Sequence, residues 1–152
     1  MRYWLFKSEP DVFGIDHLAK MPGKKDHWDG IRNYQARNLI RDEMHKGDLG
    51  FFYHSSCAVP GIVGTVSITS EAYPDHTAMD PKSRYYDPKA TKENPRWFMV
   101  DVKYKKKFKN IITLETLKQN PKLKDMRLVQ RGNRLSVMPV TLKEWEIIND
   151  MA

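Results

Sequence analysis

Residues 28–38 read Trp28-Asp29-Gly30-Ile31-Arg32-Asn33-Tyr34-Gln35-Ala36-Arg37-Asn38, and this stretch says most about the fold and the function of the chain. It brings together an indole, a phenol, two guanidiniums and three side-chain amides. These groups stack on a flat ring, form hydrogen bonds with its edge and bind a phosphate. Two interpretations are open at this point. One is a capped amphipathic helix behind a buried tryptophan, the usual role of such residues, and the other is the wall of a binding site.

A helix is expected directly after this polar cluster begins. Asn33 is suited to the N-cap, because a side-chain oxygen at that position accepts backbone N–H groups of the first turn. Apolar residues then recur at helical spacing and predict a helix from Asn33 to about His45: Ala36, Leu39, Ile40 and Met44. The polar cluster would therefore lie at a helix N-terminus, where free N–H groups favour an anion.

The rest of the chain predicts short strands and helices in mixed order. Strands are expected over residues 2–7, 48–54, 61–70, 97–109 and 135–140, and helices over residues 15–20, 113–120 and from 141 onward. Residues 73–96 contain four prolines and are expected to form a long loop. The strands at 48–54 and 61–70 suit antiparallel pairing through the turn between them. We therefore predict one α+β domain, residues 1–152, on a curved and mostly antiparallel sheet.

The composition is that of a basic globular protein. The chain has 26 Lys and Arg against 19 Asp and Glu, and this net charge of +7 favours an anionic partner, with nucleic acid as the first candidate. A single cysteine, Cys57, rules out an intramolecular disulfide and fits a reducing compartment. The sequence has no apolar run long enough to span a membrane, and its first residues lack the pattern of a signal peptide. We expect no membrane association.

Motifs for several kinds of catalysis are missing. The sequence has neither a P-loop nor a Gly-x-Gly-x-x-Gly spacing, no clustered zinc ligands and no deaminase motif. His54 and Cys57 are close in sequence, but a nucleophile and its base seldom come from neighbouring residues, and a single cysteine is more often a small apolar residue. We therefore predict no catalytic residue, no metal and no cofactor.

Polar and aromatic side chains recur where the predicted strands begin or end. Strand ends meet at one rim of a curved sheet, so these side chains are expected to line one concave pocket. Stacking on tryptophan, with hydrogen bonds to the base edge, is how proteins hold a flipped or single-stranded base. For each residue alone a structural role is the simpler interpretation, with Trp97 in the core and Ser8 capping a turn. The strand-end residues are Ser8, His54, Ser55, Ser56 and Trp97, and the pocket is expected to include Ser136 from the last strand together with Trp28 and Tyr34.

The basic residues fall into three sets. Lysines between residues 103 and 109 are expected to guard a strand edge against pairing. Arg127, Arg131 and Arg134 flank Gly132 in a turn before the last strand. A third set, which includes Arg32, is expected to surround the pocket. Contacts with backbone phosphates would make binding strongly salt-dependent, and the residues predicted to make them are Arg37, Lys82, Arg84, Lys89, Arg96 and Arg131.

A series of motifs along nearly the whole chain resembles the EVE domain. The motifs are Tyr3-Trp4-Leu5-Phe6-Lys7-Ser8-Glu9-Pro10, the stretch quoted above, Gly47-Asp48-x-x-Phe51-Phe52-Tyr53-His54-Ser55, Gly61-Ile62-Val63-Gly64, Asp80-Pro81-Lys82-Ser83-x-Tyr85-Tyr86-Asp87-Pro88, Pro95-Arg96-Trp97 and Arg134-Leu135-Ser136-Val137-x-Pro139-Val140. The resemblance implies a PUA-like fold, a small bent β-barrel surrounded by short helices. It also implies recognition of modified bases without chemistry, in a pocket formed by Ser8, Trp28, Arg32, Asn33, Tyr34, His54, Ser55, Ser56 and Trp97, with Ser136 as a weaker member.

Three functions follow from these observations. The first is a non-catalytic reader that holds a methylated or hydroxymethylated cytosine of DNA between Trp28 and Trp97. The second is an RNA-binding module that acts on tRNA or rRNA. The third is an enzyme that acts on modified nucleotides through His54 and Glu9. The resemblance further implies a cytoplasmic location for a prokaryotic protein of this size, and a nuclear location in a eukaryote.

Overall fold

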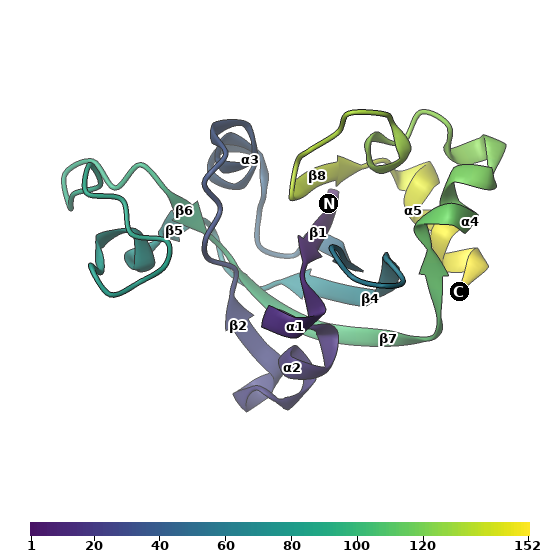
Figure 1. Ribbon diagram of the computed structural model, residues 1–152, viewed down its shortest axis with the longest axis horizontal. Helices are drawn as coiled ribbons and strands as arrows, with labels where there is room; N and C mark the ends of the chain where they lie inside the picture. Colours follow the sequence, from purple (N-terminus) through teal and green to yellow (C-terminus); the bar gives the residue numbers. More distant parts are fainter.

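The computed structural model describes residues 1–152 and is built on one curled sheet of six strands. The strands follow the order β2-β7-β4-β3-β1-β8, and Figure 1 shows the sheet bending into half a barrel. β1 and β3 run parallel, whereas every other neighbouring pair is antiparallel. The predicted curved, mostly antiparallel sheet is therefore confirmed. The bounds are Tyr3–Ser8 for β1, Lys25–His27 for β2, Leu49–His54 for β3, Gly61–Ile68 for β4, Asp101–Thr113 for β7 and Val137–Val140 for β8.

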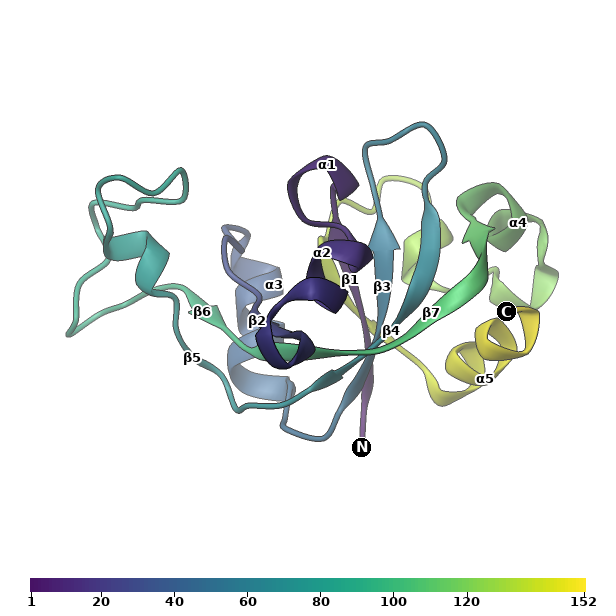
Figure 2. The same cartoon turned by 90° about the horizontal axis from the view of Figure 1, so that it is seen from below.

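Short helices occupy the connections between the strands. α1 and α2 follow β1, α3 lies between β2 and β3, and α4 and α5 flank the C-terminal end of the molecule (Figure 2). None of these helices combines the length and the hydrophobicity that crossing a membrane requires. The helices span Pro10–Phe13 (α1), Ile15–Lys20 (α2), Tyr34–Asn38 (α3), Leu114–Gln119 (α4) and Leu142–Met151 (α5), and shorter 3-10 turns span Pro22–Lys24, His76–Met79, Pro121–Leu123 and Arg127–Val129.

The helix predicted from Asn33 to His45 is present but changes character halfway. Asn33 is the N-cap of α3, and its side chain accepts the Ala36 N–H at 3.0 Å, as predicted. After α3 the chain widens into a π-helical turn over Leu39–Glu43, where the Met44 N–H donates to Leu39 O across five residues. Leu39 and Met44 are both buried, so the apolar pattern identified the buried face although the predicted helix was too regular.

The curl of the sheet arises where β4 slips in register. Its pairing with β7 shifts between Ile62 and Gly64 and again between Thr65 and Val66, and bulges of this kind bend a strand. At Gly64 a side chain would collide with the backbone oxygen of Lys106, so the bend depends on a glycine. β3 and β4 pair antiparallel through the turn after His54, as predicted. Because β1 and β3 pair in parallel, with Ser8 opposite His54, their C-terminal ends lie at one rim.

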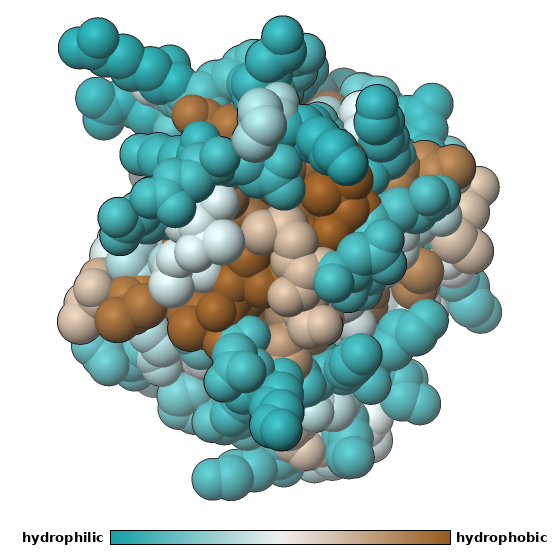
Figure 3. Space-filling model, turned by 90° about the vertical axis from the view of Figure 1, so that its right-hand side faces the viewer, coloured by the Kyte–Doolittle hydropathy of each residue, from teal (hydrophilic) through white to brown (hydrophobic).

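A core of 31 buried residues fills the curled sheet and the space beneath its helices. Trp28 belongs to this core, together with Phe6 from β1 and Phe52 from β3. Burial of aromatic side chains of this size is the main contribution to stability in a domain of this kind. On the face shown in Figure 3, apolar side chains form a central band surrounded by hydrophilic ones.

The proline-rich segment predicted as a loop forms a small substructure of its own. β5 (Tyr73–Pro74) pairs with β6 (Phe98–Met99), and a second core of Ala78, Ala90 and Trp97 fills the segment between them. The strand predicted over 97–109 therefore has the wrong bounds. It is divided at Val100, whose carbonyl accepts the Trp28 N–H at 2.8 Å, and its longer part continues to Thr113. Figure 1 shows this substructure projecting from one end of the half-barrel, opposite α4 and α5.

Candidate functional site

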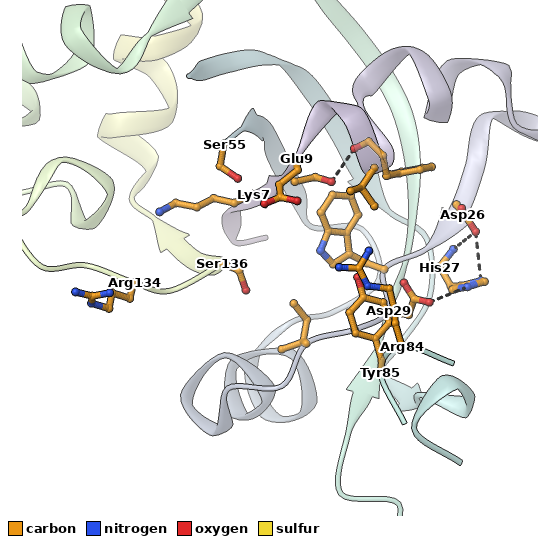
Figure 4. Close-up of a pocket in the computed structure, with 16 residues that line it drawn as sticks. Lys7, Glu9, Asp26, His27, Asp29, Ser55, Arg84, Tyr85, Arg134 and Ser136 are labelled. Carbon is orange, nitrogen blue, oxygen red and sulfur yellow. Dashed lines mark hydrogen bonds and ion pairs between the residues drawn. The ribbon is translucent and has the colours of Figure 1, made fainter. Parts of the chain in front are cut away.

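A cavity of about 530 Å³ lies at the rim where β1 and β3 end. The segment from β2 to α3 and the proline-rich segment complete its walls, and Figure 4 shows side chains from all these elements facing the same space. Its volume is in the range of pockets that enclose small organic molecules. The lining residues are Lys7, Ser8, Glu9, Val12, Phe13, Asp26, His27, Trp28, Asp29, Gly30, Ile31, Ser55, Arg84, Tyr85, Arg134 and Ser136.

Trp28 gives the cavity an aromatic surface with a free hydrogen-bond donor. Only 7% of this residue is exposed, because its ring packs against Phe6 at 5.1 Å and against Phe52 at 5.4 Å between centroids. The other two buried indole N–H groups have carboxylate partners, from Trp4 to Asp48 and from Trp97 to Asp87. Trp28 has no such partner, yet no buried side-chain nitrogen or oxygen of the protein lacks one. Its indole N–H is therefore accessible from the cavity.

Three serines at the rim add small polar groups. Ser8 donates its hydroxyl hydrogen to Phe13 O at 2.6 Å, so its oxygen is left as an acceptor. Ser55 and Ser136 are tied to β1 through the backbone, by Ser55 N to Ser8 O at 3.0 Å and by Lys7 N to Ser136 O at 2.8 Å. Their side chains line the cavity and can both donate and accept hydrogen bonds there.

The charged residues are divided between two sides of the cavity. Figure 4 places Lys7 and Arg134 on one side and Asp26, His27 and Asp29 on the other. His27 lies between the two aspartates, 3.2 Å from Asp26 and 3.6 Å from Asp29. Burial raises the pKa of Asp29, and burial lowers the pKa of Lys7. Both pKa shifts indicate that the charged forms of Asp29 and Lys7 are poorly hydrated. Such charges interact more strongly with a bound polar group than hydrated charges do.

Tyr85 forms a wall that the rest of the chain holds in position. Its ring lies against Gly30, where φ is +79° and a Cβ atom would come within 2.6 Å of the ring. Arg32 donates to Tyr85 O at 2.7 and 3.0 Å and pairs with the buried carboxylate of Asp75 at 3.0 Å. Burial alone would raise the pKa of Asp75, but hydrogen bonds from Thr77, the Gly30 N–H and Arg32 outweigh it, so this pKa is lowered. Arg32 therefore positions the wall without lining the cavity.

The structure brings some of the predicted site residues together and separates others. Ser8, Trp28, Ser55 and Ser136 line the cavity, whereas Arg32, Asn33, Tyr34, His54, Ser56 and Trp97 lie outside its lining. His54 contacts the start of α2, because its Nε2 accepts the Ile15 N–H at 3.1 Å, and burial lowers the pKa of the imidazole. Ser56 is exposed in the turn after β3, with a φ of +51°.

Tyr34 and Trp97 form a separate aromatic pair. Their rings stack with centroids 4.8 Å apart and planes at 27°. Trp97 is only 5% exposed and donates its indole N–H to Asp87 at 2.7 Å, whereas Tyr34 is 48% exposed. Arg37 lies over the outer ring at 4.8 Å and donates to the backbone oxygen of Arg96 at 2.7 Å. These side chains form a surface cluster rather than a wall of the cavity.

The residues predicted to contact phosphates occupy different surroundings. Arg84 lines the cavity and lies over the Tyr85 ring at 5.2 Å. Lys82 and Lys89 are exposed on the proline-rich segment. Arg96 lies 3.7 Å from Asp87 and donates to the Tyr34 hydroxyl, and Arg131 is exposed in a second groove.

Several lining residues are not among those predicted for the pocket. Asp26, His27 and Asp29 lie within two residues of Trp28, and Lys7 directly precedes Ser8, whereas Glu9 is expected only as the carboxylate of the enzyme alternative. Their proximity in sequence to predicted residues is a signal that points to them. Tyr85 directly follows Arg84, which is predicted to lie near the pocket, and Arg32 holds its backbone oxygen at 2.7 and 3.0 Å.

The curled half-barrel of mixed strands with a few short helices defines a PUA-like domain. The family model of the EVE domain matches residues 2–151, and the chain belongs to the EVE domain family. It is 45% identical over 162 residues to thymocyte nuclear protein 1 of Danio rerio, covering 95% of this chain and 69% of that protein.

Solved structures agree with this assignment. A protein from Pseudomonas syringae is 52% identical and superposes with a TM-score of 0.93, over 98% of both chains. Human THYN1 protein, solved in complex with 5-methylcytosine containing DNA, is 40% identical and also superposes with a TM-score of 0.93, over 99% of this chain and 97% of that one. The fold implied by the motifs is thus confirmed.

Proposed function

We propose that this protein is a non-catalytic reader that holds a modified cytosine of DNA, methylated or hydroxymethylated, in the cavity beside Trp28. The observation that carries the proposal is the free indole N–H of Trp28 in a cavity of about 530 Å³ that also holds carboxylate and hydroxyl groups. The human relative in complex with 5-methylcytosine containing DNA supports the choice of base.

The lining groups complement the polar edge of cytosine. Cytosine presents an exocyclic amine, which donates, and ring nitrogen and carbonyl acceptors. Asp29 is suited to accept from the amine, because a carboxylate is the usual partner of that group. The Trp28 indole N–H and the hydroxyl of Ser55 or Ser136 are suited to donate to the acceptors. A base reaches such a cavity only from a single strand or after it is flipped out of a duplex.

The apolar part of the lining is suited to the modification. Val12, Phe13 and Ile31 line the cavity together with Trp28, and a methyl group on the base gains free energy by leaving water for such a surface. Lys7, Arg84 and Arg134 supply positive charge around the entrance for the flanking phosphates. Binding should therefore combine a base-dependent part with a salt-dependent part.

The test is a comparison of matched single-stranded oligonucleotides that carry 5-methylcytosine or plain cytosine at one position. Wild-type protein should prefer the modified strand. Trp28→Phe keeps an aromatic ring in the core while removing the N–H, and should weaken binding by roughly two- to thirteen-fold, as expected for about 0.5–1.5 kcal/mol from one hydrogen bond. Ser67→Ala, on β4 and outside the cavity, serves as the control.

Two further measurements test the two alternatives. An RNA strand of the same sequence that binds more tightly than the DNA would identify an RNA-binding module and contradict the DNA assignment. Turnover of modified nucleotides by pure protein, lost in His54→Ala, would identify an enzyme. The engagement of His54 Nε2 with the Ile15 N–H argues against this last outcome, because a general base needs that lone pair.

A further inference from the structure

A second groove, of about 500 Å³, runs between the start of α3 and the turn before β8. Its lining contains three arginines and four side-chain amides but no carboxylate, and Leu135 is its one apolar residue. Arg134 lines both this groove and the cavity, so the two sites lie side by side. The groove is formed by Asn33, Gln35, Arg127, Gln130, Arg131, Gly132, Asn133, Arg134 and Leu135.

The three arginines of the groove have no acidic partner. Of the six other arginines, four pair with a carboxylate: Arg2, Arg32, Arg41 and Arg96. Arg127, Arg131 and Arg134 form no such pair and are all exposed. Three uncompensated guanidiniums around one concave surface create a positive potential that an anion would neutralise.

The turn that carries these arginines is held in shape by one amide. Asn133 donates to Arg127 O at 2.7 Å and accepts the Leu135 N–H at 3.1 Å, which closes the turn around Gly132. On the facing side, Asn33 uses its oxygen to cap α3, so its amide N–H₂ group is available to a ligand. The groove therefore presents donors from both sides and few acceptors, the pattern that phosphate oxygens require.

We propose that this groove binds the phosphodiester backbone next to the nucleotide whose base enters the cavity. The inference rests on the proposed function for the identity of the strand. A phosphodiester carries a single negative charge on two oxygens, which a guanidinium binds in bidentate fashion. Because Arg134 borders both sites, one strand can place its base in the cavity and an adjacent phosphate in the groove.

The test compares the double variant Arg127→Gln/Arg131→Gln with Lys118→Gln/Lys143→Gln, which removes the same charge from exposed positions on α4 and α5. The ligands are three versions of one single-stranded oligonucleotide, with 5-methylcytosine, cytosine or an abasic site at the same position. Affinities are measured over a range of salt concentrations. Circular dichroism and thermal unfolding check that both variants fold.

In the groove variant, the slope of log affinity against log salt should fall by about 1.4 if two phosphate contacts are lost, since each contributes about 0.7 on a single strand. Affinity should fall by the same factor for all three strands, and the ratio between modified and plain strands should stay that of wild type. The lysine variant should keep most of the slope. A groove variant with the same slope as the lysine variant would overturn the inference.

Failure of the proposed base reader gives a different result. In that case wild-type protein binds modified and plain strands equally, while only the groove variant shows a smaller salt slope. That result would support the phosphate groove and contradict the proposed base reader. Inorganic phosphate, added at constant ionic strength, distinguishes a free-phosphate site. Inorganic phosphate is added at concentrations that leave the salt slope of the lysine variant unchanged. If it then displaces the abasic strand, the diester assignment is overturned. If it does not displace the strand, the diester assignment is supported.

Discussion

Arg32 and the fully buried carboxylate of Asp75 are joined at 3.0 Å, and this pair attaches one wall of the cavity to the rest of the domain. Asp75 also accepts the Gly30 N–H at 2.9 Å, while Arg32 donates to the backbone oxygen of Tyr85. The proline-rich segment is thus connected to the segment between β2 and α3 through two side chains. The shape of the cavity depends on an ion pair that takes no direct part in its lining.

Arg32→Ala should destabilise the protein by about 3 kcal/mol, because loss of one partner leaves a buried carboxylate without its counter-charge. Urea unfolding measures the change in the free energy of unfolding. Limited proteolysis should show faster cleavage in the proline-rich segment, since Tyr85 loses its contact. Arg41→Ala, which breaks an exposed pair with Asp42, is the control and should cost much less. Equal losses in the two variants would contradict the structural role of Arg32.

Gly30→Ala should close part of the cavity or displace its wall. The residue has a φ of +79°, and the new methyl group would lie 2.6 Å from the ring of Tyr85. Gly23→Ala is the matched control, because its φ is +66° but a methyl group there would meet no atom within 4 Å. The control should cost about 1–2 kcal/mol from backbone strain alone. Gly30→Ala should cost more, and Tyr85→Ala in the same chain should remove the excess, as a double-mutant cycle by thermal unfolding can measure.

Asp29 should make base binding depend on pH. Burial raises its pKa above the usual value near 3.8, so the carboxylate is fully ionised only above that raised pKa. If the ionised carboxylate accepts a hydrogen bond from the cytosine amine, the affinity for the base is highest at neutral pH. It then falls as the pH drops through the pKa of Asp29. Asp29→Asn should bind more weakly at neutral pH and should lose this part of the pH dependence.

Subtracting the two pH profiles removes the titration of cytosine itself, which both proteins share. Asp125→Asn, an exposed substitution outside the cavity, is the control and should follow the wild-type profile. A variant at position 29 with the wild-type profile would place the titrating group elsewhere.

The sequence predicts the parts of this molecule that depend on local pattern. The cap at Asn33, the pairing of β3 with β4 and the buried face of the helix after residue 33 all follow from spacing and side-chain type, and the structure confirms them. Four residues predicted for the pocket also line the cavity, and two of them, Ser8 and Ser55, lie at the adjacent ends of β1 and β3.

The remaining features depend on contacts that no local pattern encodes. The proline-rich segment has no periodicity, and its path is set by the pairing of β5 with β6 and by Asp75. Trp97 is drawn into the small core of that segment, away from the cavity lining. For the same reason the contribution of Tyr85 to the wall is visible only in three dimensions.

Substitutions of Tyr34 and Trp97 test whether this aromatic pair contributes to base binding or only to the surface cluster. Trp97→Ala should cost about 3–5 kcal/mol of stability, as removal of a buried aromatic side chain usually does. Tyr34→Ala, at a position that is 48% exposed, should change stability far less. Since neither residue lines the cavity, Tyr34→Ala should keep the wild-type ratio of affinities for modified and plain oligonucleotides. A ratio that falls to one in Tyr34→Ala, with unfolding unchanged, would instead assign the base contact to this aromatic pair.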